Sequence, residues 1–165
     1  SSRGANLAAF YYAGHGIQVK NQNYLIPVNA RIESEASVPY QGVNLNDPAV
    51  RKRHNDAVFF GQMTGQRMNE NGLVQRVAEL SLADSLGIPA PSVVEIRRVA
   101  REMTTSPDGK NADGLNKFLE FAAKQLNISD EETRARFENY IKDTWRIQKA
   151  ISTLAGSGHA TITTR

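Results

Sequence analysis

From Asp47 onward, the chain is a succession of amphipathic segments, each bounded by residues that start and stop helices. Asp47-Pro48 combines an N-cap side chain with proline at the first helical position, while Gly87 and Asn127 suit the left-handed conformation that ends helices. Apolar residues recur every three or four positions in these segments, which is typical of amphipathic helices. We predict helices over 47–63, 71–86, 92–103, 113–126 and 129–154.

Polar residues at the predicted helix starts support this assignment. Ser92 and Glu95, and again Ser129 and Glu132, have the spacing of a capping box, and Asp113 can cap the fourth helix. One face of the longest helix is apolar apart from a threonine and carries Phe137, Tyr140, Ile141, Thr144, Ile147, Ile151 and Leu154. The pattern predicts a bundle of about five helices.

The first 45 residues have a different composition, with only five of the 37 charged side chains of the chain. The apolar run over 7–12 predicts a buried strand, and 17–19 and 24–28 predict a hairpin around the turn 20–23. Pro27 implies an edge or the end of a strand.

We interpret residues 31–46 as an irregular connection. The predicted fold is therefore mostly α, and α+β overall, with a small strand and hairpin segment over 1–46, a helical domain over 47–155 and a flexible tail over 156–165. A strand and one hairpin leave edges and apolar faces uncovered. We therefore expect the first segment to be poorly stabilised unless it docks on the helices or dimerises.

Composition excludes several classes of function. The chain has no Cys, which removes disulfides, Cys-based zinc sites and any thiol nucleophile supplied by this chain. A net charge of +3 is too small and too evenly spread to indicate nucleic-acid binding, and no apolar run is long enough for a membrane span. His15, His54 and His159 are too dispersed for a zinc motif, so we predict neither a metal nor a cofactor. The chain does not begin with Met, which suggests a fragment or a processed product.

The most suggestive motif for chemistry is Phe10–Gly16, which places His15 between two glycines after an apolar run. A histidine acts as a general acid or base only when a nucleophile or a bound water lies within hydrogen-bond reach, and a structural or solvent-exposed histidine fits this spacing as well. Together with Asn23–Ala30, this string resembles the caspase and metacaspase superfamily of cysteine peptidases over residues 5–46.

The resemblance implies that His15 matches the catalytic histidine and that Gly16 matches a backbone position beside the substrate oxyanion. The catalytic cysteine of that family follows a later strand in an Asp-Ala-Cys context, and this sequence has no such segment. The resemblance therefore implies a catalytically incomplete segment.

The helical part has a resemblance of its own. The string Leu73–Ile88, the Ser92 capping box, Asp108-Gly109-Lys110 and the long helix after Phe137 are similar to the N-terminal helical domain of the SurA and PpiD periplasmic chaperones, over residues 48–154. The resemblance implies that the helical part holds unfolded polypeptides. Prolyl isomerisation is not implied, because that activity lies in separate parvulin domains that nothing here matches.

Four apolar residues are candidates for an open binding surface, namely Phe59, Phe60, Met63 and Met68. Neighbouring phenylalanines cannot both face one narrow core, and methionine adapts to varied partners. The alternative is that neighbouring helices bury them. The basic run 51–54 is interpreted as a solvated helix face rather than a phosphate site, since Asp47 and Asp56 lie nearby.

The leading hypothesis is a polypeptide-binding, chaperone-like helical module that carries a catalytically incomplete caspase-like segment and is not a self-sufficient enzyme. A first alternative is a fragment of a cysteine endopeptidase whose Cys lies on another chain or a missing segment. A second is an artificial junction with no joint function. The expected partner is an unfolded or extended polypeptide, a homodimer is possible, and the compartment would be periplasmic or cytoplasmic according to which half governs.

Overall fold

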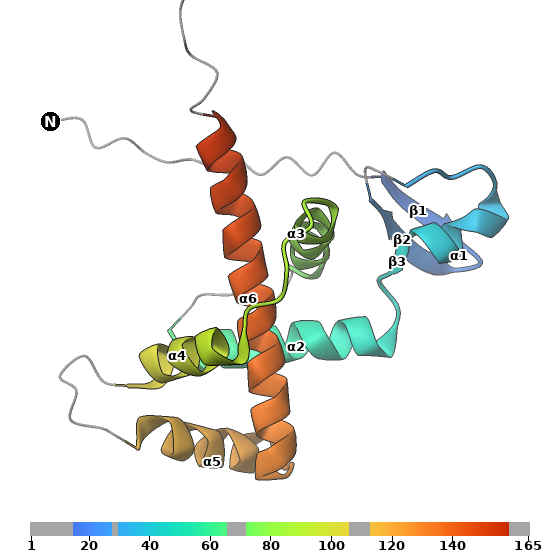
Figure 1. Ribbon diagram of the computed structural model, residues 1–165. Coiled ribbons are helices and arrows are strands. Elements are labelled where there is room, and N and C mark those ends of the chain that lie inside the picture. Colours follow the sequence, from blue (N-terminus) through green and yellow to red (C-terminus); the bar gives the residue numbers. More distant parts are fainter. Residues whose placement is uncertain (1–14, 28–29, 66–71, 106–112, 159–165) are drawn as a thin grey trace, which may run out of the picture.

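The structure is a computed structural model that describes residues 15–27, 30–65, 72–105 and 113–158 (Figure 1). Within these residues it contains six α-helices, one short 3-10 helix and a three-stranded antiparallel sheet, which confirms the predicted mostly α fold. The elements are β1 (His15–Val19), β2 (Gln22–Ile26), η1 (Glu35–Ser37), α1 (Val38–Gln41), β3 (Val43–Asn44), α2 (Pro48–Met63), α3 (Leu73–Ser85), α4 (Val93–Thr104), α5 (Gly114–Leu126) and α6 (Asp130–Gly158).

The helices begin and end close to the predicted positions because local capping residues fix them. Asp47 accepts a hydrogen bond from the Ala49 N–H at 2.8 Å, and both halves of the box between Ser92 and Glu95 are formed. Asn127 ends α5 with φ of 53°. The start of α6 differs from the prediction: Ser129 accepts from the Glu132 N–H at 3.1 Å, but the Glu132 carboxylate bonds to side chains of α2 and α6.

The predicted hairpin is confirmed as β1 and β2, which pair antiparallel with His15 opposite Ile26. Its turn is shorter than expected and consists of Lys20 and Asn21, whose φ angles of 49° and 62° match a two-residue hairpin turn. β2 ends at Ile26, directly before Pro27, as its position predicted. The predicted strand over 7–12 lies outside the described residues.

The interpretation of 31–46 as irregular is wrong, since this segment forms η1, α1 and β3. Val38 is 1% exposed and packs with Val19, Tyr24 and Ile26 in a small cluster on the sheet. β3 adds a third strand to β2, with Val43 opposite Leu25. Elements of two to four residues depend on such contacts, so local sequence signals did not predict them.

The main core lies where α6 is packed by α2, α4 and α5 (Figure 1). The residues with the least exposure at its centre are Ala57, Phe60, Ala122, Phe137, Tyr140 and Ile141. Most of the predicted apolar face of α6 is buried, although its last member, Leu154, is 42% exposed. Apolar periodicity in the segment 92–103 also suggests an inward position for Val93, but this is wrong, because Val93 is 61% exposed in the first turn of α4.

A separate cluster joins the sheet to the helices. Leu25 of β2, which is 3% exposed, packs with Val77 and Ala78 of α3. Partly buried residues from β3, the loop that follows it, α2 and α3 extend this cluster, namely Val43, Leu45, Val50 and Leu73. The hairpin therefore docks on the helical part, which is the condition under which we expected it to be stabilised.

Candidate functional site

The residues matched to a peptidase site are placed only in part. His15 begins β1, and its side chain lies outside the described part of the structure. Gly16 is exposed, and a Cβ built on it would have no heavy atom within 4 Å. The peptidase hypothesis therefore stays a prediction.

Three of the four apolar binding candidates lie in the described residues, and all three pack in or against the main core. Phe60 is 0% exposed, and its ring centroid lies 5.1 Å from that of Phe137. Phe59 and Met63 are partly buried against the same core, and Met68 lies outside the described residues. The binding role is wrong for Phe60, because α5 and α6 cover its ring, and the alternative of burial by neighbouring helices holds.

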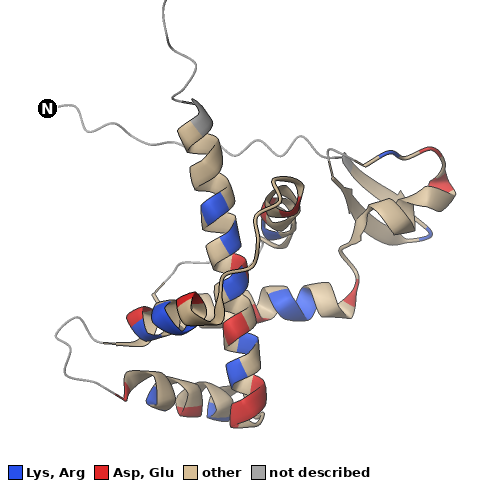
Figure 2. Cartoon of the chain, viewed as in Figure 1, with Lys and Arg blue, Asp and Glu red and all other residues tan. Residues whose placement is uncertain are grey.

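The basic run at the start of α2 is not a uniform solvated face. Arg51 and Lys52 are exposed, but His54 is 6% exposed and Arg53 pairs with Asp143 of α6. The solvated interpretation is therefore wrong for His54, which is buried, whereas Arg53 remains 55% exposed although it pairs with Asp143. Figure 2 shows basic and acidic residues interspersed along α6, so no continuous face of one charge appears there.

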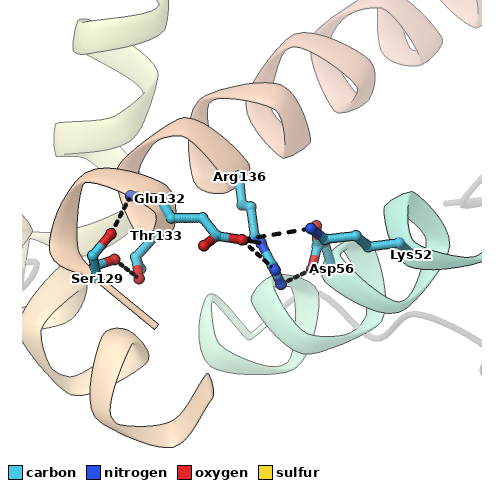
Figure 3. Close-up of polar contacts among 6 residues, drawn as sticks. All are labelled: Lys52, Asp56, Ser129, Glu132, Thr133 and Arg136. Atoms are coloured by element: carbon cyan, nitrogen blue, oxygen red, sulfur yellow. Dashed lines mark hydrogen bonds and ion pairs between the residues drawn. The ribbon is translucent and has the colours of Figure 1, made fainter. Parts of the chain in front are cut away.

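A polar network joins α2 and α6 (Figure 3). Arg136 donates to Glu132 at 2.5 Å and to Asp56 at 3.3 Å, and Lys52 lies 3.5 Å from Glu132. The hydrogen bond from Arg136 lowers the pKa of Glu132, whereas burial raises the pKa of Asp56 more than the attraction of Arg136 lowers it. Each group already has a partner, so this network serves to hold the two helices together.

A second charged cluster is buried between α2, α3 and α6. The Asp143 side chain is 1% exposed and that of Arg76 is 7% exposed. Arg53 donates to Asp143 through two nitrogens, with Nε 2.6 Å from Oδ2, while Arg76 Nη2 lies 3.4 Å from the same oxygen. The Arg76 Nε–H is buried and has no hydrogen-bond acceptor among the described residues.

The two arginines differ in their electrostatic environment. The hydrogen bond to Asp143 raises the pKa of Arg53, whose side chain is 55% exposed. Burial lowers the pKa of Arg76, and the nearby Asp143 only partly offsets that effect. Arg76 is therefore a buried cation whose charge is incompletely compensated.

A cavity of about 160 Å³ opens beside this cluster, at the junction of β3, α2 and α3. Its walls are mostly apolar. The lining residues are Val43, Val50, Arg53, His54, Leu73, Arg76, Val77, Leu80, Ser81 and Asp84. We refer to it as the junction cavity.

A wider groove of about 550 Å³ runs between α4 and the C-terminal half of α6. Val99, Met103 and Trp145 supply its apolar surface. Its polar residues are Arg98, Glu102, Gln148, Lys149 and Ser152. We refer to it as the α4–α6 groove.

Two side-chain contacts shape this groove. Arg98 donates to Glu102 at 2.9 Å, and Lys149 Nζ lies 5.8 Å from the centroid of the half-buried Trp145 ring. The groove thus combines apolar surface with cations, an anion and neutral hydrogen-bonding groups.

Sequence reasoning missed both hollows, although a signal for the junction cavity was present. Arg76 lies three residues after Leu73 and four before Leu80, and Asp143 lies three after Tyr140 and four before Ile147. Each charge therefore interrupts an apolar helix face, and such charges are rarely buried unless they are paired.

The described residues contain no group of three or more acidic or histidine side chains arranged to hold a metal ion. Among the described helices, none has the length and apolar character that crossing a membrane requires. No family model, curated protein or solved structure matches this chain. The class defined by the fold is a helical bundle with a docked three-stranded antiparallel sheet.

Proposed function

We propose that this chain is a polypeptide-binding helical module and that the α4–α6 groove holds a segment of an unfolded or extended polypeptide. The observation that carries the proposal is the combination, in one groove of about 550 Å³, of an apolar surface with polar groups of both charges. This volume lies in the range of pockets that bind small molecules, about 300–1,000 Å³.

The chemistry of the groove suits a polypeptide of varied sequence. Met103 is adaptable in shape and Trp145 offers a flat aromatic surface, so both can accommodate different apolar side chains. Gln148 is exposed beside them and can bond to peptide N–H and C=O groups. The groove can also pair with charged side chains of the client, since Arg98 and Lys149 are cationic and Glu102 is anionic.

The peptidase-fragment alternative rests on the resemblance around His15 alone. The side chain of His15 lies outside the described residues, so this alternative stays a prediction.

The test uses the single tryptophan of the chain, which lies in the groove. Dilution of a urea-unfolded outer-membrane polypeptide into the protein should change Trp145 emission with saturation, and the protein should suppress aggregation of that polypeptide. Ser152→Tyr places a ring in the groove from an exposed position and should weaken both effects. Ser85→Tyr, an exposed change on α3 outside the groove, is the matched control and should leave them unchanged.

Two results would remove the proposal. One is no change of Trp145 emission and no suppression of aggregation at stoichiometric excess. The other is equal activity of Ser152→Tyr and the unmodified protein, which would place binding elsewhere on the chain.

A further inference from the structure

We propose that the junction cavity binds a small aliphatic carboxylate, with the carboxylate on Arg76 and the aliphatic part against the walls of β3, α2 and α3. The cavity lies apart from the α4–α6 groove and shares no lining residue with it. The inference is therefore independent of polypeptide holding.

Hydrogen bonding gives the first argument. The side chain of Arg76 is more than nine-tenths buried, it lines the cavity, and its Nε–H has no acceptor among the described residues. A buried donor without an acceptor is costly. Because Nε is itself buried, a turn of the Arg76 side chain toward the cavity is needed for a ligand oxygen to accept from it, and that hydrogen bond would stabilise the complex. Guanidinium groups match carboxylates in geometry and charge.

The charges around the cavity give the second argument. Arg53 and Arg76 share one carboxylate, Asp143, while Asp84 is paired with Arg146 at 2.5 Å. When Arg146, which lies outside the cavity lining, is counted, three arginines face two aspartates and one positive charge is in excess. A monoanion balances it, whereas a doubly charged phosphate would bring excess negative charge beside the buried Asp143.

The walls define the rest of the ligand. Five aliphatic side chains surround the polar end, namely Val43, Val50, Leu73, Val77 and Leu80. A cavity of about 160 Å³ is similar to engineered apolar cavities that hold one benzene-sized molecule. A branched chain of four to five carbons is about that size. The chemistry is shared by a free branched-chain acid and by the C-terminal leucine of a polypeptide.

The experiment follows the Arg76 Nε–H resonance by ¹H–¹⁵N NMR during titration with 4-methylpentanoate. The resonance should shift with saturation, and the dissociation constant should be about tenfold or more below that of 4-methylpentanamide, because a charge-assisted bond is lost in the amide. Acetate, which lacks the branched chain, should bind more weakly by a similar factor. N-acetyl-Gly-Gly-Leu with a free or an amidated C-terminus then distinguishes the two sources.

Two variants probe the site itself. Leu80→Phe fills the cavity from α3 while leaving every charged group in place, and it should weaken binding of 4-methylpentanoate about tenfold. Leu86→Phe, beyond the end of the same helix and outside the cavity, should bind like the unmodified protein. Arg76→Lys keeps the charge but loses the Nε–H and should also bind weakly.

Each outcome decides the proposal. Tighter binding of the free acid identifies a metabolite-like ligand, and tighter binding of the peptide with a free C-terminus identifies a chain end; both support the site. Equal shifts with acetate and 4-methylpentanoate would show adventitious anion binding only and overturn it. No saturable shift of the Arg76 resonance, or unchanged binding in Leu80→Phe, would overturn it as well.

Discussion

The side chain of Asp143 is 1% exposed, and its carboxylate pairs with Arg53 and Arg76. Replacing Asp143 with Asn would leave the buried Arg76 guanidinium without a counterion. Loss of one partner of a buried ion pair typically costs about 3–5 kcal/mol, because the other charge remains desolvated. We expect the free energy of unfolding, measured by urea denaturation, to fall by about that amount.

The matched control for this prediction is Glu102→Gln. Glu102 pairs with Arg98 at 2.9 Å, but both side chains are about 60% exposed. Exposed pairs contribute about 0–1 kcal/mol, so the control should unfold at nearly the same urea concentration as the unmodified protein. Similar losses in the two variants would show that burial does not set the importance of Asp143.

For single residues, the sequence contained a signal for burial at Arg76 and Asp143 that the helix assignment did not use. Charges at positions 76 and 143 interrupt apolar helix faces, which marks each residue as buried with a partner. The pairing itself joins residues 67 positions apart. Helical periodicity specifies which face a side chain lies on, whereas the partner across the core depends on how the helices cross.

Among the elements, the N-terminus of α4 is fixed by the capping box between Ser92 and Glu95. Hydrogen bonds from the backbone N–H and the hydroxyl of Ser92 lower the pKa of Glu95. Because the folded pKa is below the unfolded value of about 4.3, this stabilisation is complete above that pH. It is lost as the pH falls through the folded pKa.

We expect Ser92→Ala to lower the free energy of unfolding at pH 7 by about 1 kcal/mol. The Glu95 pKa, followed by ¹³C NMR of its carboxyl group, should rise but remain below its ordinary value, since the backbone bond is retained. Ser85→Ala, at the end of α3, should leave this pKa unchanged. A Glu95 pKa that is identical with and without the Ser92 hydroxyl would contradict the assignment.

The short segment between α1 and β3 supplies a second test at the scale of elements. A Cβ on Gly42 would lie 2.7 Å from Ile26 Cδ1, 3.1 Å from the Val38 oxygen and 3.2 Å from Tyr24 Cβ. The Ile26 methyl can move, but the Val38 oxygen belongs to the backbone of α1 and the Tyr24 β-carbon to β2, so neither shifts easily. We expect Gly42→Ala to destabilise the protein by about 1–3 kcal/mol in thermal or urea unfolding, as overpacking does.

Gly16→Ala is the control, because a Cβ there meets no heavy atom within 4 Å. Its effect on unfolding should be small. Equal midpoints for the two variants would show that the segment near Gly42 repacks freely.

Elements differ in how far local sequence determines them. The ends of α2, α4 and α5 were predicted from residues within or beside each helix, such as Asp47, Ser92 and Asn127. α1 and β3 were not, because their stability comes from contacts with the hairpin, and Gly42 has no distinctive role until Ile26 and Tyr24 lie beside it.

In the whole molecule, the sheet and the helices are joined through Leu25, which packs with Val77 and Ala78 of α3. The break in charge density near residue 46 suggested two separate parts, but charge density does not report on contacts between them. The junction cavity lies at this same contact, since Val43, Val50, Leu73 and Val77 belong both to its walls and to the joining cluster. Docking of the sheet is thus a condition for the proposed carboxylate site.

This coupling predicts the behaviour of Leu25→Ala. Truncating a buried leucine costs about 2–5 kcal/mol, and here the loss falls on the contact between the hairpin and α3. We expect β1, β2 and α3 to lose hydrogen-exchange protection together, while the core of α2, α5 and α6 around Phe60 remains protected. Limited trypsin digestion should then cut after the exposed Arg31 faster than in the unmodified protein.

Ile17→Ala, a half-buried change in the hairpin outside the joining cluster, should weaken β1 and β2 but leave protection of α3 intact. If α3 kept its full protection in Leu25→Ala, the two parts would be neighbours without mutual stabilisation, and the proposed site would not depend on the sheet.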